Sequence, residues 1–411
     1  GGREPDAPVF GGGGQGGRIQ EFTWDGKLVW NYKFATEKHL AHHDVALMSN
    51  GNILVIAWEA KTYEEAVRAG RKPGTIPKAG LWPDKIVEIK PVGTNDAIIV
   101  WEWHLWDHMI QNLDSTKNNF GQPSAHPELI DLNLGAAELK PVTVEELNKQ
   151  RAENNAVTNS TPDNGGSDAY HINAIDFNET LNQIVLSSPH LDEVLIIDHS
   201  TTTAESAGHK GGRWGKGGDF LYRWGNSQNY GKGDSSDHQL GGQHNIMWIP
   251  KGYPGSGNLM VYNNSVPNSK MPYSAVYEWT APLTSKGYTL SERGNFEPKQ
   301  PSWKFVASDT LSAFSPFISG AHRMMNGNTF IAIGAKGRFL EVTPEGKIVW
   351  DYWTPYAGYV KMKDGTYPQP IGKFVFATFR ATHIPLDHPA VKGKTLVPLN
   401  PQPVFFDEPK H

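Results

Sequence analysis

The sequence predicts an all-β protein: a single six-bladed β-propeller over residues 1–411, with a polar, partly helical insertion at 107–167 on one rim. Three observations predict this fold. One phrase is repeated near the two ends of the chain, a second phrase recurs between them, and the composition is rich in turn residues. The 411 residues include 43 Gly and 29 Pro, which suits many short strands joined by tight turns.

The repeated phrase has the pattern of a β-hairpin. Gly17-Arg-Ile-Gln-Glu-Phe-Thr-Trp-Asp-Gly-Lys-Leu-Val-Trp-Asn-Tyr32 returns as Gly337-Arg-Phe-Leu-Glu-Val-Thr-Pro-Glu-Gly-Lys-Ile-Val-Trp-Asp-Tyr352. Each copy has an alternating strand, a turn at Asp-Gly or Glu-Gly, and a second strand that ends in aromatic residues. Two copies about 320 residues apart indicate a radially repeated architecture whose ends lie close together.

The second phrase is a histidine, an alternating apolar strand, a turn that usually contains Gly or Asn, and a β-branched strand. Its copies begin at His43, His171, His244 and His383. His322 begins a related copy but lies three residues closer to its turn, outside the strict register. A period of about 60–75 residues over this length predicts six blades.

The segment 107–167 breaks this repeat. It is polar, with a helical pattern near 144–151 and a loop-like end rich in Asn and Gly. We interpret it as an insertion that covers one rim of the propeller as a lid.

The composition excludes several classes of function. A formal net charge of −5 argues against a nucleic-acid partner, because phosphate binding needs a basic face. The absence of Cys excludes disulfides, thiolate metal sites and cysteine nucleophiles. No apolar run of about 18 residues is present, so no membrane span is expected. The glycine runs at 11–17 and 211–218 lead into strand-like segments rather than helices, which argues against a dinucleotide site.

The register of the histidines indicates where the chemistry lies. The innermost strand of each propeller blade follows the central channel, so His43, His171, His244 and His383 are expected to converge there. Converging imidazoles can bind a metal or an anion, or act as nucleophile and acid–base. His104 and His108 form a second pair at i and i+4, which a helix would place on one face.

Several phrases together resemble the bacterial arylsulfotransferase family, whose members are six-bladed propellers. They are His43-Asp with Asn50-Gly51-Asn52, the segment 337–350, Trp101-Glu-Trp-His-Leu-Trp-Asp-His108, and Ile196-Ile-Asp-His-Ser-Thr-Thr-Thr203. The likeness runs from about Gly16 to Leu399. It implies transfer of a sulfuryl group from an aryl sulfate ester to a phenol through a transient sulfohistidine, with no cofactor, in a periplasmic or secreted protein.

The resemblance also implies roles for single residues. His171, His244 and His322 match the family's three channel histidines in chain order, so His322 is the expected nucleophile and His244 the second choice. His43 joins them from the first copy. The family's arginine has no counterpart in Val261-Tyr-Asn-Asn-Ser265, and Arg323 or Arg380 is expected to replace it.

Two other functions remain open at this stage. The excess of histidines favours, as an alternative, an oxidoreductase or hydrolase in which Asp44 or Asp107 supports an all-imidazole site for copper, iron or zinc. Its ligands would be His43, His104, His108, His171, His244 and His383. A binding propeller without catalytic activity is the third possibility.

Overall fold

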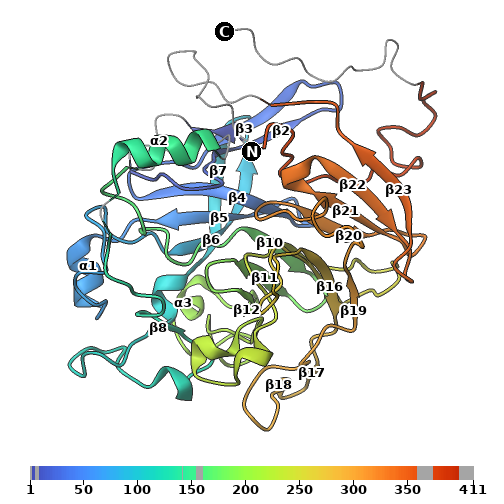
Figure 1. The fold of residues 1–411 in the computed structure, drawn as a ribbon. Coiled ribbons are helices and arrows are strands. Elements are labelled where there is room, and N and C mark those ends of the chain that lie inside the picture. Colours follow the sequence, from blue (N-terminus) through green and yellow to red (C-terminus); the bar gives the residue numbers. More distant parts are fainter. Residues whose placement is uncertain (1, 5–8, 141, 154–160, 359–373, 398–411) are drawn as a thin grey trace.

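A computed structural model of the chain describes residues 2–4, 9–140, 142–153, 161–358 and 374–397. Strands make up most of its regular structure and gather into sheets that are antiparallel except for the parallel pair β8–β9 (Figure 1). None of the helices in these ranges is both long and apolar enough to cross a membrane.

Four sheets contain four strands each, hydrogen-bonded in chain order. The first contains β4 (His39–Leu47), β5 (Ile53–Glu59), β6 (Asp84–Val92) and β7 (Asp96–His104). The second contains β10 (Ala174–Asn178), β11 (Gln183–Ser188), β12 (Glu193–Asp198) and β13 (Tyr222–Trp224). The third contains β14 (His244–Trp248), β15 (Leu259–Asn263), β16 (Ala275–Trp279) and β19 (Trp303–Phe305). The fourth contains β20 (Gly320–Arg323), β21 (Thr329–Ile333), β22 (Arg338–Val342) and β23 (Ile348–Trp353).

Smaller elements complete the described fold. A three-stranded sheet contains β1 (Gly2–Arg3), β2 (Gly17–Phe22) and β3 (Leu28–Lys33). Two strand pairs are β8 (Met109–Ile110) with β9 (Ile130–Asp131), and β17 (Leu283–Thr284) with β18 (Gly287–Tyr288). The α-helices are α1 (Tyr63–Arg68), α2 (Val144–Glu153) and α3 (Thr203–Ser206). The 3-10 helices are η1 (Leu105–His108), η2 (Pro123–Ala125), η3 (Ser227–Tyr230), η4 (Ser235–Asp237) and η5 (Gly334–Lys336).

The first strand of each four-stranded sheet lies toward the centre of the molecule. β10 contacts both β4 and β14, and β14 contacts β20, whereas the last strands lie outside (Figure 1). Sheets whose first strands surround a common centre are the blades of a β-propeller. The described residues supply four complete blades and the sheet of β1–β3, so the count of six stays a prediction.

The repeated phrase forms the same hairpin twice. Ile19 pairs with Tyr32 in β2–β3, and Phe339 pairs with Tyr352 in β22–β23. Gly26 and Gly346 occupy the turns with φ of 87° and 84°, a conformation that glycine adopts without steric cost.

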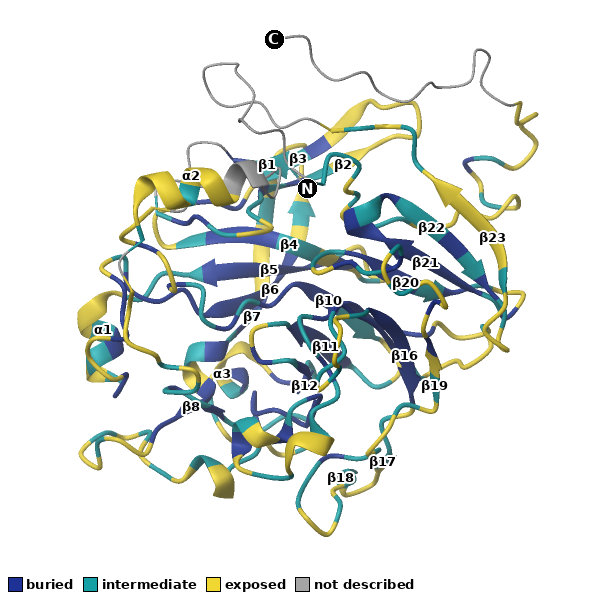
Figure 2. Cartoon of the chain, in the orientation of Figure 1, coloured by how far each residue is buried: buried dark blue, intermediate teal, exposed yellow. Residues whose placement is uncertain are grey.

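The core lies in the seams between blades. β5, β11, β12 and β15 are buried almost throughout, whereas β7 and β23 expose much of their length (Figure 2). One seam packs Ile56 and Trp103 of the first blade against Leu186 of the second. This burial holds the innermost strands in fixed positions.

Side chains also join the innermost strands through buried hydrogen bonds. Asp44 of β4 accepts from the N–H of Ile175, and Asp176 of β10 accepts from the N–H of Trp248. In the same way Asn245 of β14 accepts from the N–H of Ala321. Each hydrogen bond joins the innermost strand of one blade to the innermost strand of the next blade. The distances between neighbouring innermost strands are therefore fixed.

The segment 107–167 contains β8, η2, β9 and α2. Loops from it and from the second blade border a cavity of about 920 Å³ that Asp168 and His190 also line. Its role as an insertion or lid stays a prediction.

Candidate functional site

Three histidines from different blades meet at the centre. His43 lies in β4, His171 precedes β10 by three residues, and His244 begins β14. The rings of His43 and His171 have centroids 4.5 Å apart and nearly perpendicular planes. Burial lowers the pKa of His43 well below its usual value, and the charges of His171, His42, His244 and Arg380 lower it further. We call His42, His43, His171, His190 and His244 the histidine cluster.

The backbone takes the same unusual conformation at three of these strand starts. His43, His171 and Asn245 have φ of 53°, 52° and 58°, in the left-handed region that non-glycine residues seldom adopt. Such a residue costs about 1–3 kcal/mol and persists only where the surrounding structure holds it.

His171 pairs with an acid in the cluster. Its Nδ1 lies 2.5 Å from Oδ2 of Asp168, whose Oδ1 accepts from Trp58 Nε1. Burial opposes a charge on His171, but the Asp168 carboxylate overcomes it and raises the pKa of His171. The ring of His190 stacks on His171 at 4.6 Å. The charged form is therefore favoured more at His171 than in a free imidazole.

His42 connects the cluster to a buried acid. Its Nδ1 is 2.8 Å from Nδ1 of His43, and its Nε2 is 3.0 Å from Oδ1 of Asp84. Its ring stacks on Trp58 at 4.2 Å. Burial lowers the pKa of His42 to about 3, so this imidazole stays neutral.

His244 is neutral and has both ring nitrogens engaged. Nδ1 donates toward the oxygens of Gly242 and Asn264, each at 2.9 Å, and Nε2 accepts from the N–H of Ile318 at 3.2 Å. Burial lowers the pKa of His244 to about 4.

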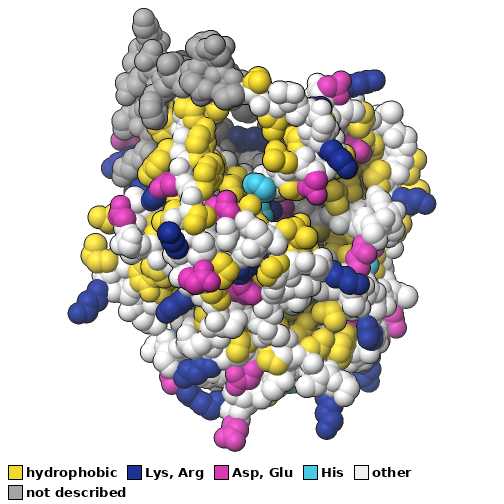
Figure 3. Space-filling view, turned by 90° about the vertical axis from the view of Figure 1, so that its right-hand side faces the viewer, with side chains coloured by type: hydrophobic (Ala, Val, Ile, Leu, Met, Phe, Trp, Pro, Cys, Tyr) yellow, Lys and Arg dark blue, Asp and Glu magenta, His cyan; other side chains and the backbone are white. Residues whose placement is uncertain are grey.

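His322 lies apart from the cluster, in a cavity of about 490 Å³ that we call the His322 cavity. Its Nε2 accepts from the N–H of His383 at 3.3 Å, so Nε2 carries the lone pair. Burial lowers the pKa of His322 to about 4, and the charge of His383 adds to this. Figure 3 shows a hollow on this side of the molecule, with histidine and basic side chains in it and hydrophobic side chains around it.

The walls of the His322 cavity are of two kinds. The polar lining comes from Asn245, His322, Arg323, Asn326, Arg380, Thr382 and His383. The apolar lining comes from Met247, Pro250, Tyr253, Met324, Met325 and Pro385. Ligand sites of this size commonly combine an apolar wall with a few convergent polar groups.

The two arginines expected at the site differ. Arg380 binds Asp44 in a bidentate pair, with Nη1–Oδ1 at 3.1 Å and Nη2–Oδ2 at 2.9 Å, and its Nε has no partner among the described residues. Its side chain is 25% exposed. Arg323 is only 6% exposed and is held by Glu278 and by the carbonyl of Gly327. Arg323 also lines the His322 cavity, and its partners Glu278 and Gly327 stabilise the blade, so its role in the site stays a prediction.

The six-histidine metal site is not formed. Residues 103 and 104 end β7 and only 105–108 form a 3-10 turn, so His104 and His108 do not share a helix face. His104 contacts Glu59 and Glu102; burial opposes its charge, but the two acids raise its pKa to about 9. His108 contacts Asp219. His383 is exposed at the His322 cavity, and of the two supporting acids Asp44 binds Arg380 while Asp107 borders another cavity.

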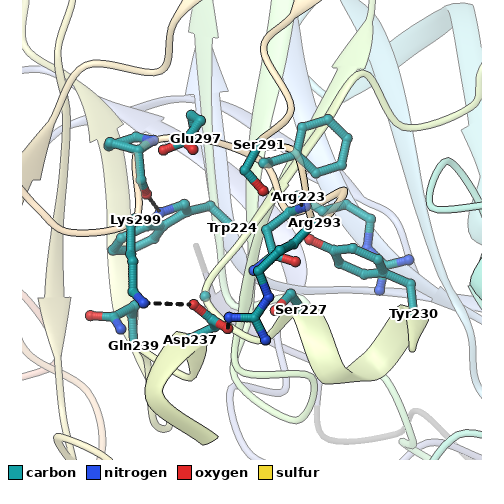
Figure 4. A pocket seen from close by; sticks show the side chains of 14 residues that line it. Arg223, Trp224, Ser227, Tyr230, Asp237, Gln239, Ser291, Arg293, Glu297 and Lys299 are labelled. Carbon is teal, nitrogen blue, oxygen red and sulfur yellow. Dashed lines mark hydrogen bonds and ion pairs between the residues drawn. The ribbon is translucent and has the colours of Figure 1, made fainter. Parts of the chain in front are cut away.

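A smaller cavity of about 100 Å³ lies between the second blade and the loop at 289–299. In Figure 4, Arg293 and Lys299 both point toward Asp237, with N–O distances of 3.5 Å. No histidine lines it, and it is too small for an aromatic ester.

Sequence reasoning missed several residues around these sites. Asp84, Asp168 and His190 carry no local motif, and only Asp168 lies close in sequence to its imidazole partner. His42 and Asp44 belong to a His-His-Asp run that is recognisable in the sequence. Their partners Asp84 and Arg380 are distant in the chain, so the sequence does not show the pairing.

Comparison of the sequence with models of known protein families identifies the family of the chain. A model of the family described as arylsulfotransferase (ASST) matches residues 12–350. The chain belongs to the arylsulfotransferase family. Membership makes the protein a transferase, and the family's nucleotide-independent sulfuryl transfer needs no cofactor.

Solved structures similar to this arylsulfotransferase are distant. A Bacteroides caccae protein of unknown function shares 12% identity, with 82% of this chain and 74% of that chain covered and a TM-score of 0.37. The periplasmic gluconolactonase of Pseudomonas aeruginosa shares 9% identity, with 86% of this chain and 71% of that chain covered and a TM-score of 0.34. The Cps50 (Swd1) β-propeller domain of Myceliophteria thermophila also shares 9% identity. The match covers 82% of this chain and 83% of that chain, with a TM-score of 0.33. No curated protein matches the chain.

Proposed function

We propose that the protein transfers a sulfuryl group from an aryl sulfate ester to a phenol in the His322 cavity, with His322 as the nucleophile. The observation that carries this proposal is one cavity in which a neutral imidazole and a guanidinium lie beside an apolar wall. The apolar lining residues suit an aromatic ring, and the polar lining residues suit the sulfate group.

The reaction has two displacements. The Nε2 lone pair of His322 attacks sulfur, the bond from sulfur to the aryl oxygen breaks, and the phenolate leaves and takes a proton from water. A phenol then attacks the sulfur of the sulfohistidine, the N–S bond breaks, and the phenol proton passes to solvent. A neutral imidazole is competent for the first step because its lone pair is not protonated.

Cations near the cavity support the charge that develops on the sulfuryl oxygens. The guanidinium of Arg380 lines the cavity and can supply such a positive charge. Arg380 also binds Asp44, the residue that follows His43, so it connects the cavity with the cluster. We assign the histidine cluster to positioning: it holds the ring of inner strands and the surroundings of the Arg380–Asp44 pair.

The surroundings of His322 suit a nucleophile better than those of His244. Both accept a backbone N–H at Nε2, but His244 is buried and its Nδ1 is also fixed. The bond to His322 is longer, at 3.3 Å, and comes from an exposed segment. Substrate binding can displace such a bond more easily.

The test is to trap the intermediate. The protein is mixed with 4-nitrophenyl sulfate without acceptor, quenched in alkali and analysed by mass spectrometry. We expect the added mass of one SO₃ group on the peptide that contains His322, its loss on addition of phenol, and ping-pong kinetics. His322→Ala should abolish the adduct, whereas His126→Ala, at a half-exposed histidine outside the cavity, should keep it. An adduct on His244, or turnover without any adduct, would contradict the assignment.

We also propose, from the family resemblance, that the protein acts in the periplasm or outside the cell. Fractionation of cells that express the complete gene tests this, and recovery only with cytosolic markers would overturn it.

A further inference from the structure

A second constellation of side chains lies away from both the histidine cluster and the His322 cavity. It joins His108 at the end of η1, His209 in the loop after α3, and Asp219 in the loop before β13. Within the described ranges, these are the histidine and acidic side chains whose ligand atoms approach closely as a group of three, all within 4.8 Å of one another. The proposed transfer reaction uses none of them.

The hydrogen bonds of His108 fix where its lone pair points. Its Nε2 lies 2.8 Å from the carbonyl oxygen of Ser206, which can only accept, so Nε2 carries a proton. In the neutral ring the lone pair is then on Nδ1, which lies 2.8 Å from Oδ1 of Asp219. Nδ1 of His209 lies 2.8 Å from the same oxygen. Two imidazole nitrogens facing one carboxylate oxygen need either two protons or one cation among them.

The ring of His108 is held rigidly. It stacks on Trp103 with planes 3° apart, and Trp103 itself donates to the carbonyl of Gly218. A Cβ at Gly218 would lie 2.6 Å from Nε2 of His108, so only glycine fits there. A histidine whose second nitrogen donates to a carbonyl, in a fixed plane, has the surroundings typical of a metal ligand.

We propose that His108, His209 and Asp219 bind one divalent transition-metal ion, with zinc as the best match. Zinc commonly takes imidazole and carboxylate ligands at about 2.0–2.1 Å, in threes where a fourth position stays open. Tetrahedral bonds of that length separate ligand atoms by about 3.3 Å, so the site must open by about half an ångström. The side chain of His209 is 59% exposed and can supply this movement.

The site is accessible from outside. His209, together with Asp107 and His126, lines a cavity of about 750 Å³. Asp219 and His108 lie beneath it, with 7% and 0% of their side chains exposed. An ion can therefore enter beside His209, and water can take its fourth position.

Zinc titration of chelator-treated protein tests the proposal by calorimetry and elemental analysis. We expect one zinc ion per chain and a higher Tm with zinc. His209→Ala, at an exposed position, and Asp219→Asn should weaken binding by at least about tenfold. His126→Ala, in the same cavity, and His43→Ala, in the histidine cluster, should bind as the parent does.

Three outcomes would overturn the site. They are no zinc bound by the parent protein, unchanged affinity in His209→Ala, and loss of binding in His43→Ala instead. The first would mean that two protons occupy the positions between the rings and Asp219. Failure of the zinc site would not count against the proposed transfer reaction, because the assay of that reaction needs no metal.

Discussion

The histidine cluster and the His322 cavity use the same side chain in opposite surroundings. In the cluster the imidazoles contact one another, buried acids and backbone groups, and Asp168 raises the pKa of His171. In the cavity a neutral ring stands beside an apolar wall. Alignment of histidines in the repeat therefore predicts their convergence, whereas use as a nucleophile depends on a neutral ring whose lone pair a substrate can reach and on room for that substrate. Four changes test this contrast.

The largest effect is expected from comparing alanine substitutions in the two regions. His322→Ala removes the proposed nucleophile and should lower kcat/KM for 4-nitrophenyl sulfate by about 10³-fold or more. His43→Ala acts only through the surroundings of Arg380 and should lower it by about tenfold. Release of 4-nitrophenol with phenol as acceptor measures both. A larger loss of kcat/KM in His43→Ala than in His322→Ala would contradict the contrast between the two regions.

Gly14→Ala tests how tightly the cluster is packed. Gly14 has a φ of +71°, and a Cβ there would lie 2.1 Å from the ring of His43. We expect a loss of about 3 kcal/mol in the free energy of unfolding, from backbone strain and the clash together. Gly26→Ala, with a φ of +87° and open space around it, should lose only about 1 kcal/mol. Equal losses in denaturant melts would mean that the contact with His43 does not matter.

Acid should destabilise the cluster through its neutral histidines. The pKa of His244 is about 4 in the folded protein and about 6.5 when unfolded, so between these values the unfolded chain binds more protons. Stability from this group is therefore present above pH 6.5 and lost as pH falls toward 4. Between pH 7.5 and 5 the loss is about 2 kcal/mol. Urea melts at both pH values should show that much less pH dependence in His244→Asn; an unchanged dependence would place the titration elsewhere.

The smallest effect is expected at the cavity wall. Met325→Ser removes apolar surface at a side chain that is 64% exposed, so it should raise KM for an aryl sulfate about threefold and leave kcat unchanged. Met271→Ser is the matched control, at 67% exposure and outside the cavity lining. A change in kcat rather than KM would mean that the wall does more than bind the ring.

The sequence predicted what local patterns determine. The hairpins at 17–32 and 337–352 follow from alternation and Gly turns, and the strand starts of His43, His171 and His244 follow from the repeat. His322, which the repeat placed outside the strict register, lines the His322 cavity instead of joining the histidine cluster.

Contacts made across the fold were beyond such patterns. His42 with Asp84 joins distant segments, and the positive φ at His43 arises from packing that no motif records. The error at His104 and His108 has a similar cause. An i, i+4 spacing indicates a shared helix face only if a helix forms, and β7 continues to His104 instead.

The pair of Arg380 and Asp44 has a consequence for biosynthesis. Its partners are 336 positions apart, and one of them borders the proposed reaction chamber. The ribosome must therefore have synthesised the chain as far as Arg380, beyond all four complete blades, before this boundary can be completed. A chain that stopped after the fourth blade would carry His43, His171, His244 and His322 and would still lack Arg380 at this boundary.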